Sequence, residues 1–291
     1  MKIKNKISEY ILKAYAYNRK TFKIRGAYKA LKVLSNYLPY LKKIPISFNE
    51  TGKTYVDVNA PDTFWILNHY LGDVSSSMIQ IYRIGELVIA PGDTIWDVGA
   101  NMGFMSWRFA KKEFQLDQIH LFEPLKKPFA IASNLLSGVQ RVKLHNFGLG
   151  DKNESLCIYH GEGTGDASIK VKTEAQKTSL NSEFVLIKRG DDIIDELKSD
   201  LPSFIKIDVE GYECEVLRGI KKIIEIKQPV IIFEILFLKD VEIESIIPDG
   251  YKIAFINEHT GDLIHQLPDA RKIGVMDAIL APKNSHIWEK L

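Results

Sequence analysis

One acidic residue and two glycines lie where an apolar run, Thr94–Val98, leads into a turn. The pattern is D-x-G-x-N-x-G, with Asp97, Gly99, Asn101 and Gly103 at its named positions. Ligands of open α/β sheets bind outside the carboxyl ends of the strands, and glycine lets the backbone approach them closely. We expect Asp97 to accept a hydrogen bond from a cationic amino group of the ligand. The third glycine of G-x-G-x-x-G and the Gly-Lys-Ser/Thr of a phosphate loop are missing, so the turn favours a cofactor without a pyrophosphate.

Two further apolar runs end in residues that suit a nucleoside. Glu123 and Pro124 follow the run 119–122, and Glu123 comes 26 residues after the aspartate of the glycine turn. An acid at that distance is placed to accept both ribose hydroxyls, although a lone acid at a strand end is more often a helix cap or a surface charge. The next run ends at Asn146 and Gly148, where small residues leave room for an adenine ring. Three consecutive strand ends thus predict a nucleoside site.

A fourth run, 204–209, carries ionisable residues. Lys206, Asp208 and Glu210 occur at alternate positions, and alternate side chains of a strand point to the same face. Charges on a central strand are costly unless they pair or serve a site. One interpretation is an internal salt bridge that fixes the strand end, and the other places Asp208 beside the reacting groups.

Strand-like and helix-like runs alternate along most of the chain. This order predicts an α/β fold, a doubly wound, mainly parallel, seven-stranded sheet with helices on both faces. The helical runs include 103–112 and 214–226. The expected strands are 94–98, 119–122, 142–147, 204–209, 230–235, 252–256 and 275–280.

Three parts of the chain are expected. Residues 1–44 form a basic arm of two amphipathic helices, 45–90 a hairpin and a helix, and 91–291 the main domain. The hairpin is expected over 45–58. Segment 160–182 is rich in Gly, Ser, Thr and Lys and poor in apolar residues, which predicts a mobile loop of the kind that often forms a lid.

The composition is that of a globular protein with an uneven distribution of charge. Of 39 basic and 37 acidic residues, residues 1–44 hold twelve basic and one acidic residue. The arm is either a solvated helical face or a contact for a membrane surface or another anionic partner. The two cysteines, Cys157 and Cys214, show no metal-type spacing, and no signal peptide or spanning segment is evident. We expect a cytoplasmic protein, with a location at the membrane periphery as the alternative. The sequence leaves the oligomeric state open.

Taken together, three motifs resemble the FkbM family of S-adenosylmethionine-dependent methyltransferases. They are D-V-G-A-N-M-G from Asp97, F-E-P around Glu123, and K-I-D-V-E-G-Y-E from Lys206. The D-V-E-G-x-E part is more specific than the glycine turn, which all class I methyltransferases share. The resemblance covers about 90–240 and implies transfer of a methyl group from S-adenosylmethionine to a hydroxyl of a sugar, glycan or natural product.

Methyl transfer to an alcohol is an in-line displacement that benefits from a base. Positioning supplies a large part of the barrier reduction, and proton removal adds roughly 10²–10⁴-fold. Asp208 is the first candidate for this base and Glu210 the second, ahead of His160, His259 and Glu234. A Mg²⁺ ion held by the first two acids is an alternative, but two carboxylates are a thin set of ligands.

Other functions have weaker support in the sequence. The chain lacks Asn-Pro-Pro-Tyr/Phe, Pro-Cys and a spaced cysteine triad, which disfavours the methyltransferase classes that act on nucleic-acid amino groups and cytosine C5, and radical enzymes. Residues 45–291 are net acidic, which disfavours a surface that tracks phosphates. A nucleoside-binding scaffold without turnover and a nicotinamide-dependent oxidoreductase stay open as alternatives.

Overall fold

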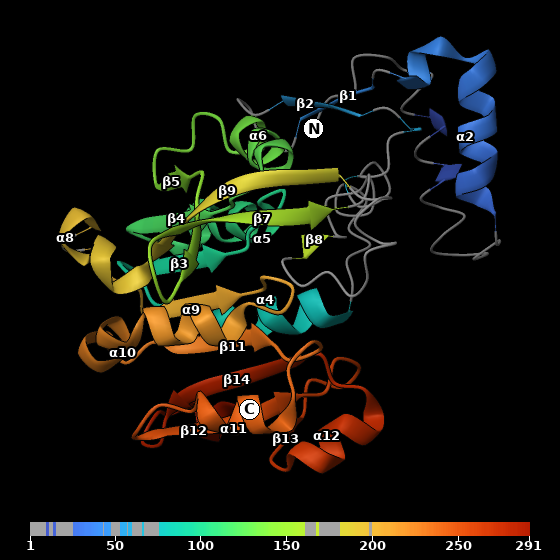
Figure 1. Cartoon of the computed structure of the whole chain (residues 1–291). Coiled ribbons are helices and arrows are strands. Elements are labelled where there is room, and N and C mark those ends of the chain that lie inside the picture. Colours follow the sequence, from blue (N-terminus) through green and yellow to red (C-terminus); the bar gives the residue numbers. More distant parts are fainter. Residues whose placement is uncertain are drawn as a thin grey trace.

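The computed structural model in Figure 1 describes most of the main domain and parts of the N-terminal region. The described residues are 10–11, 14–15, 26–42, 44–47, 53–56, 58–59, 66, 76–160, 167–168, 181–197 and 200–291. Among these residues, no helix is both long enough and apolar enough to cross a membrane.

An eight-stranded sheet in the order β13-β12-β14-β11-β10-β3-β4-β5 forms the centre of the fold. The five strands from β11 to β5 are parallel, and β14, β12 and β13 run antiparallel to their neighbours. The bounds are β3 Thr94–Val98, β4 Gln118–Phe122, β5 Val142–His145, β10 Phe204–Ile207, β11 Val230–Glu234, β12 Tyr251–Ile256, β13 Leu263–Ile264 and β14 Asp277–Pro282.

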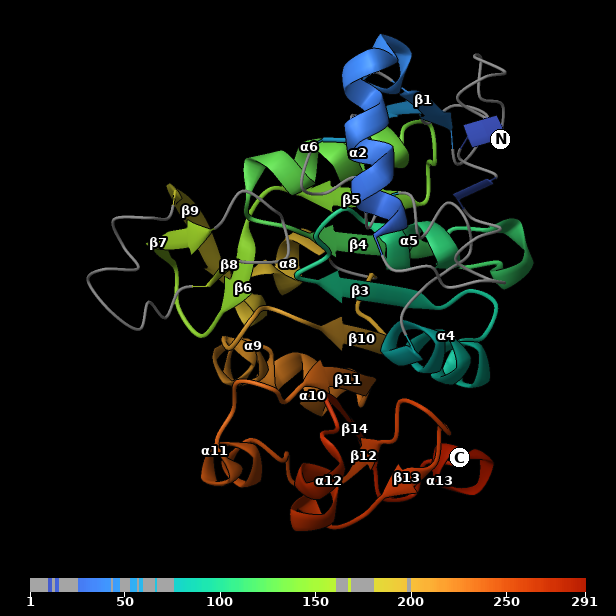
Figure 2. The same ribbon diagram turned by 90° about the vertical axis from the view of Figure 1, so that its right-hand side faces the viewer.

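Helices cover both faces of this sheet, as Figures 1 and 2 show. Because strand side chains alternate, Ile95 of β3 packs with one helical layer and Trp96 with the other. The first layer contains α4 (Ser76–Val88), α5 (Phe104–Phe109), α6 (Lys126–Leu135) and α13 (Ile287–Lys290). The second contains α9 (Glu213–Gly219), α10 (Lys221–Lys227), α11 (Asp240–Ser245) and α12 (Leu267–Ile273). The predicted doubly wound α/β fold is confirmed.

The sheet differs from the prediction in two respects. It has an eighth strand, β13, which pairs with β12 across a turn in which Gly261 has φ +82°. Two residues give too short an alternation to recognise in a sequence. In addition, β10 ends at Ile207 rather than at residue 209, and the chain turns away at Glu210 and Gly211, which both adopt positive φ.

A second sheet of four strands, β6-β9-β7-β8, was not predicted. Its strands are β6 Gly148–Gly150, β7 Glu154–His160, β8 Ala167–Ser168 and β9 Asn181–Arg189. Figure 2 shows it on the side to which β3, β4 and β10 point. Of the predicted loop 160–182, residues 160, 167–168 and 181–182 belong to these strands, and the rest lies outside the described residues. Two short elements follow the sheet, η3 (Gly190–Ile193) and α8 (Ile194–Leu197).

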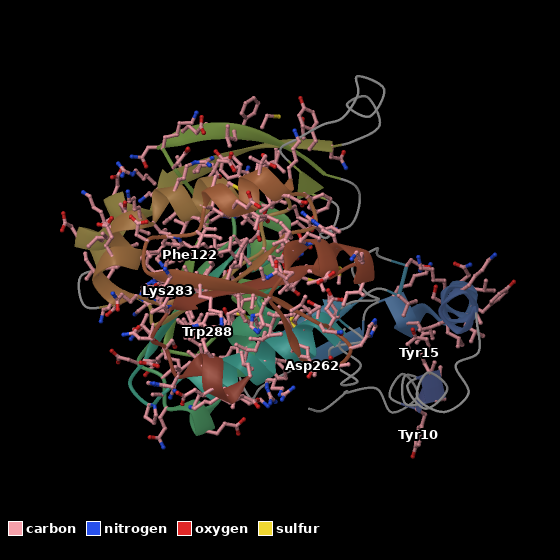
Figure 3. All side chains as sticks on the ribbon, turned by 90° about the horizontal axis from the view of Figure 1, so that it is seen from below. Tyr10, Tyr15, Phe122, Asp262, Lys283 and Trp288 are labelled. Atoms are coloured by element: carbon pink, nitrogen blue, oxygen red, sulfur yellow. The ribbon has the colours of Figure 1, made fainter. Side chains whose placement is uncertain are left out.

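The N-terminal region contributes a helix and a hairpin. Helix α2 spans Ala27–Tyr37 and is followed by η1 (Pro39–Lys42). Strands β1 (Ile44–Ser47) and β2 (Lys53–Val56) pair antiparallel, as the hairpin prediction required. In Figure 3, Tyr10 and Tyr15 lie on the N-terminal segment, apart from Phe122 in the main domain. The first predicted arm helix falls mostly outside the described residues, and the contact of the arm with an anionic partner stays a prediction.

Candidate active site

The predicted site residues lie at the carboxyl ends of three adjacent strands. Strand β3 pairs with β4 on one side and β10 on the other, all parallel. In this register Val98 is level with Phe122 and Ile207. The turns that follow the three strands therefore begin at one edge of the sheet. Phe122 packs edge-on against Trp96 with 5.1 Å between ring centroids, which fixes β4 against β3 just below this edge.

The two glycines of the β3 turn are required by the protein itself. Gly99 has φ +73°, and a Cβ there would lie 1.9 Å from the carbonyl oxygen of Asp208. Gly103 has φ +78°, and its Cβ would meet Leu121 and Ala132 at 3.1 and 3.0 Å. The expectation that these glycines let a ligand approach closely stays a prediction. The structure adds a second reason, because each one admits a neighbouring part of the chain in a conformation that other residues rarely adopt.

Asp97 is enclosed within the domain. Its side chain is 0% exposed, and Oδ2 accepts hydrogen bonds from the backbone N–H and the hydroxyl of Ser106 at 3.2 and 2.8 Å. Its Oδ1 has no hydrogen-bond donor and lies 3.9 Å from Lys206 Nζ. Burial raises the pKa of Asp97. The expected bond from Asp97 to a ligand amino group stays a prediction, and in this structure Oδ2 of the carboxylate ties β3 to α5 through Ser106.

Glu123 is held by the backbone on both sides. Its Oε2 accepts the N–H of Asn101 at 2.8 Å, and its Oε1 accepts the N–H of Leu125 at 2.9 Å. Asn101 has φ +51°, which turns its N–H from the β3 turn toward β4. Burial raises the pKa of Glu123 to about 7. A carboxylate keeps further lone pairs after two such bonds.

The end of β5 is tied to the end of β4. Asn146 donates from Nδ2 to the carbonyl oxygens of Glu123 and Pro124, at 2.9 and 3.1 Å. Gly148 is buried, and a Cβ there would lie 2.7 Å from the Ile187 side chain of β9. The structure therefore brings together the residues predicted from the second and third strand ends. The small size of Gly148 also leaves room for Ile187 of the second sheet.

Lys206 links the acids of β3 and β10. Its Nζ lies 3.0 Å from Asp208 Oδ2 and 3.4 Å from the carbonyl oxygen of Gly99. Burial alone would lower the pKa of Lys206, but the carboxylates of Asp208 and Asp97 raise it above its usual value. The internal salt bridge, one of the two interpretations of the sequence, is therefore present between Lys206 and Asp208. Asp208 is 41% exposed at its side chain, so it also faces solvent at the strand end.

The second catalytic candidate, Glu210, does not continue the strand face of Lys206 and Asp208. Glu210 has φ +55° and Gly211 has φ +99°, so the chain reverses directly after β10. Glu213 closes this turn, since its Oε1 accepts the N–H groups of Val209 and Gly211 at 3.0 and 3.2 Å. Two successive left-handed residues and a 1% exposed acid define the turn. The D-V-E-G-x-E spacing was the only signal in the sequence for this role of Glu213.

A further acid, Glu234, lies at the end of β11. It is opposite Asp277 in the register of β11 and β14, and Ser77 donates a hydrogen bond to Asp277. Burial, and next the negative charge of Asp208, raise the pKa of Glu234 to about 9. Its Oε2 has no hydrogen-bond partner. Glu234 therefore joins the acids around Asp208, whereas His259 lies in an exposed turn after β12.

Among the residues that the structure describes, no group of three or more His, Cys, Asp or Glu side chains is arranged to hold a metal ion. His120, which is buried, and His145, which is half-buried, contact one another instead, with 3.0 Å between His120 Nδ1 and His145 Nε2. Burial lowers the pKa of both, to about 4 for His145.

The chain is similar in sequence to known methyltransferases. Residues 97–267 match the model of the methyltransferase FkbM domain. Hexuronic acid methyltransferase AglP of Haloferax volcanii is 27% identical over 128 residues, which are 44% of this chain and 49% of that protein. Methyltransferase 1 of Beauveria bassiana is 27% identical over 161 residues, 49% of this chain and 64% of that protein. The chain thus spans about half of the first relative and less than two thirds of the second.

A solved structure also matches the chain at low sequence identity. The crystal structure of methyltransferase FkbM from Methylobacillus flagellatus is 17% identical, with a TM-score of 0.47, and the match covers 75% of this chain and 53% of that one. The family model spans the glycine turn, Glu123 and the D-V-E-G turn, and it extends over more than half of the 291 residues. The chain belongs to the methyltransferase FkbM domain family.

Proposed function

We propose that the protein uses S-adenosylmethionine to methylate a hydroxyl group of a sugar, a glycan or a related natural product. Glu123 carries this proposal. Two backbone amides fix its carboxylate at the edge where β3, β4 and β10 end, and an acid in that place suits the two hydroxyls of a ribose. Among cofactors that contain a nucleoside, membership of a methyltransferase family favours the methyl donor S-adenosylmethionine.

The residues at the strand ends fit such a cofactor. Glu123 would hold the ribose, and Asn146 and Gly148 would border the adenine. Asp97 would act indirectly, by fixing the start of α5 through Ser106. When bound, S-adenosylmethionine supplies an electrophilic methyl group. Its sulfonium and amino charges would suit an edge rich in carboxylates.

Asp208 is the proposed base. An alcohol must lose its proton as its oxygen attacks the methyl carbon, and the exposed carboxylate of Asp208 lies at the end of β10 beside the proposed cofactor site. Lys206 fixes the side chain through one carboxylate oxygen at 3.0 Å. The other oxygen can then accept a hydroxyl proton. Glu210 remains the second candidate on the adjacent turn.

One of the two relatives favours a sugar as the acceptor. AglP is named as a hexuronic acid methyltransferase. The acceptor in this chain would bind beyond Asp208, near the ends of β10 and β11, because the Asp208 side chain is 41% exposed there.

Thermal unfolding with added nucleotides tests the cofactor. We expect S-adenosylhomocysteine at 100 times its dissociation constant to stabilise the fold by about 2.7 kcal/mol, which raises Tm by roughly 5 °C in a chain of this size. NAD⁺ at the same concentration should leave Tm unchanged. A shift with NAD⁺ alone would replace the proposal by a nicotinamide-dependent oxidoreductase. Binding without methyl transfer to any sugar of an acceptor panel would leave only a nucleoside-binding scaffold.

The affinity for S-adenosylhomocysteine should depend on pH through Glu123. Its pKa is raised to about 7 by burial, and ribose hydroxyls donate to the ionised form. Affinity is therefore expected to be highest above pH 7 and to fall as Glu123 becomes protonated between about pH 7 and 5. Glu123→Gln should bind about 1–3 kcal/mol more weakly at pH 8 and show a flatter profile. Calorimetric titration at four pH values measures both, and an unchanged profile in the variant would reject the ribose assignment.

A further inference from the structure

Two apolar side chains are displayed immediately after β11. Leu236 and Phe237 are 50% and 48% exposed, whereas their neighbours Ile235 and Leu238 are 0% and 5% exposed. A single exposed hydrophobic residue is ordinary on a protein surface. Here the two exposed residues form a short tip, which we call the 235–238 tip, and both of its ends are anchored in the core.

Arg271 holds this tip in place. Its guanidinium donates to the carbonyl oxygen of Ile235 at 3.1 Å and to that of Leu238 at 2.6 Å, and it also bonds Asp240 at 3.1 Å. The N–H of Ile235 donates in turn to the carbonyl oxygen of Met276 at 2.7 Å. The Phe237 ring and the Leu236 methyl groups are thus carried on a backbone that is fixed at both ends. A ligand would therefore meet a surface that is already ordered.

The tip lies against the turn that carries the proposed catalytic acids. A Cβ on Gly211 would be 3.3 Å from the Cβ of Phe237, and Gly211 directly follows Glu210. Glu234 comes immediately before the tip and is close enough to Asp208 for the two charges to interact. Figure 2 shows the chain passing from β11 to α11 on the side to which β10 points. Phe237 and Glu234 therefore border the face of Asp208 that an acceptor would approach.

An aromatic ring beside carboxyl groups has the chemistry of a sugar site. One face of a pyranose ring presents C–H groups, whose positive edge is attracted by the negative face of an aromatic ring. The hydroxyls around the ring need hydrogen-bond partners, and Glu234 has an unpartnered Oε2 for one of them. A flat apolar surface with a few convergent polar groups is the common form of a small-molecule site.

We propose that Phe237 is the platform on which an uncharged sugar ring stacks, with the Glu234 carboxyl group bonded to one of its hydroxyls. This inference rests on the proposed function and assigns the acceptor side of that site. Glu234 serves as the hydrogen-bonding partner and Asp208 as the base, so the two acids have separate roles. Both Phe237 and Glu234 are positioning residues.

The charge around the tip selects an uncharged ring. At neutral pH a pKa near 9 keeps Glu234 protonated, so it can donate a hydrogen bond. The charges that act on Glu234 are all negative, and Lys206 is already shared by two carboxylates. A carboxylate on the acceptor would be repelled there. The acids that act on Glu234 are Asp208, Glu210, Glu213 and Asp277.

Binding of simple glycosides to the protein loaded with S-adenosylhomocysteine tests the proposal. The probes are the methyl glycosides of glucose, galactose and mannose, with the methyl glycosides of the three corresponding uronic acids. Saturation-transfer NMR should show contacts to the C–H groups of at least one neutral ring and at least tenfold weaker binding of its uronic counterpart. Equal or stronger binding of the uronic acids, or no binding of any neutral ring, would overturn the proposal.

Matched variants locate the platform. Phe237→Ala should weaken binding of the neutral glycoside about three- to tenfold and Phe237→Tyr should restore it, while Leu236→Ala, at an equally exposed neighbour, should leave it unchanged. With an active acceptor, the Phe237→Ala effect should fall on KM and leave kcat near the wild-type value. A loss of the same size in Leu236→Ala would contradict a specific platform. Failure of S-adenosylhomocysteine to bind would instead reject the proposed function, so the two failures are distinguishable.

Discussion

Lys206→Met is expected to lower the free energy of unfolding by about 3–5 kcal/mol, the typical cost of removing one partner from a buried charge pair. Lys206 is 5% exposed and lies between Asp97 and Asp208. Methionine retains most of the volume of the side chain, so little cavity is formed. The loss comes from Asp97, whose carboxylate would remain in the core without a cation. Urea-induced unfolding of both proteins measures the difference.

The pH dependence separates this cause from a packing defect. Asp97 can relieve its isolation by binding a proton, since burial already raises its pKa. The destabilisation of Lys206→Met should therefore become smaller as the pH is lowered, because the variant gains a native-state proton that the unfolded chain does not hold. Lys221→Met, at an exposed position of α10, is the control and should change stability by less than about 0.5 kcal/mol. A constant difference across pH would point to packing instead.

Asp208→Asn is expected to lower turnover by about 10²–10⁴-fold, the usual contribution of a general base. The amide keeps the shape of the side chain but cannot take the proton of an acceptor hydroxyl. Binding of S-adenosylhomocysteine should change little, because the proposed ribose and adenine contacts lie on β4 and β5. Single-turnover methylation and calorimetric titration measure the two properties. Near-normal turnover would move the base elsewhere, and Glu210→Gln is the variant to compare.

Much of the fold follows from local patterns in the sequence. The predicted strand 94–98 coincides with β3, and the other six predicted strands overlap β4, β5, β10, β11, β12 and β14. A buried parallel strand is a continuous apolar run, which a sequence displays directly. The predicted helix 214–226 is divided at Ile220 into α9 and α10. The second sheet was not recognised because β6 has only three residues, two of them glycine, and β8 only two.

The site could be predicted to the level of strand ends, but not to the level of side-chain direction. Strand order brought Glu123, Asn146 and Asp208 to one edge, as their positions after apolar runs indicate. Asp97 accepts a hydrogen bond from the hydroxyl of Ser106, a residue that belongs to none of the sequence motifs. The reversal at Glu210 depends on backbone angles that alternate spacing does not reveal. Long-range contacts of this kind decide which acid faces solvent, and a local pattern contains no information about them.

The contact between Gly99 and Asp208 has a consequence for how this family member can vary. The carbonyl oxygen of Asp208 occupies the volume where any other residue at position 99 would place its Cβ, and the N–H of Asp208 donates to Val98 at 3.0 Å. The turn after β3, proposed to bind the methyl donor, and the turn after β10, proposed to bind the acceptor, are therefore packed directly against one another. Substitutions in the two turns should show energetic coupling in double-mutant cycles, so these two segments must evolve as a pair while the surrounding loops diverge.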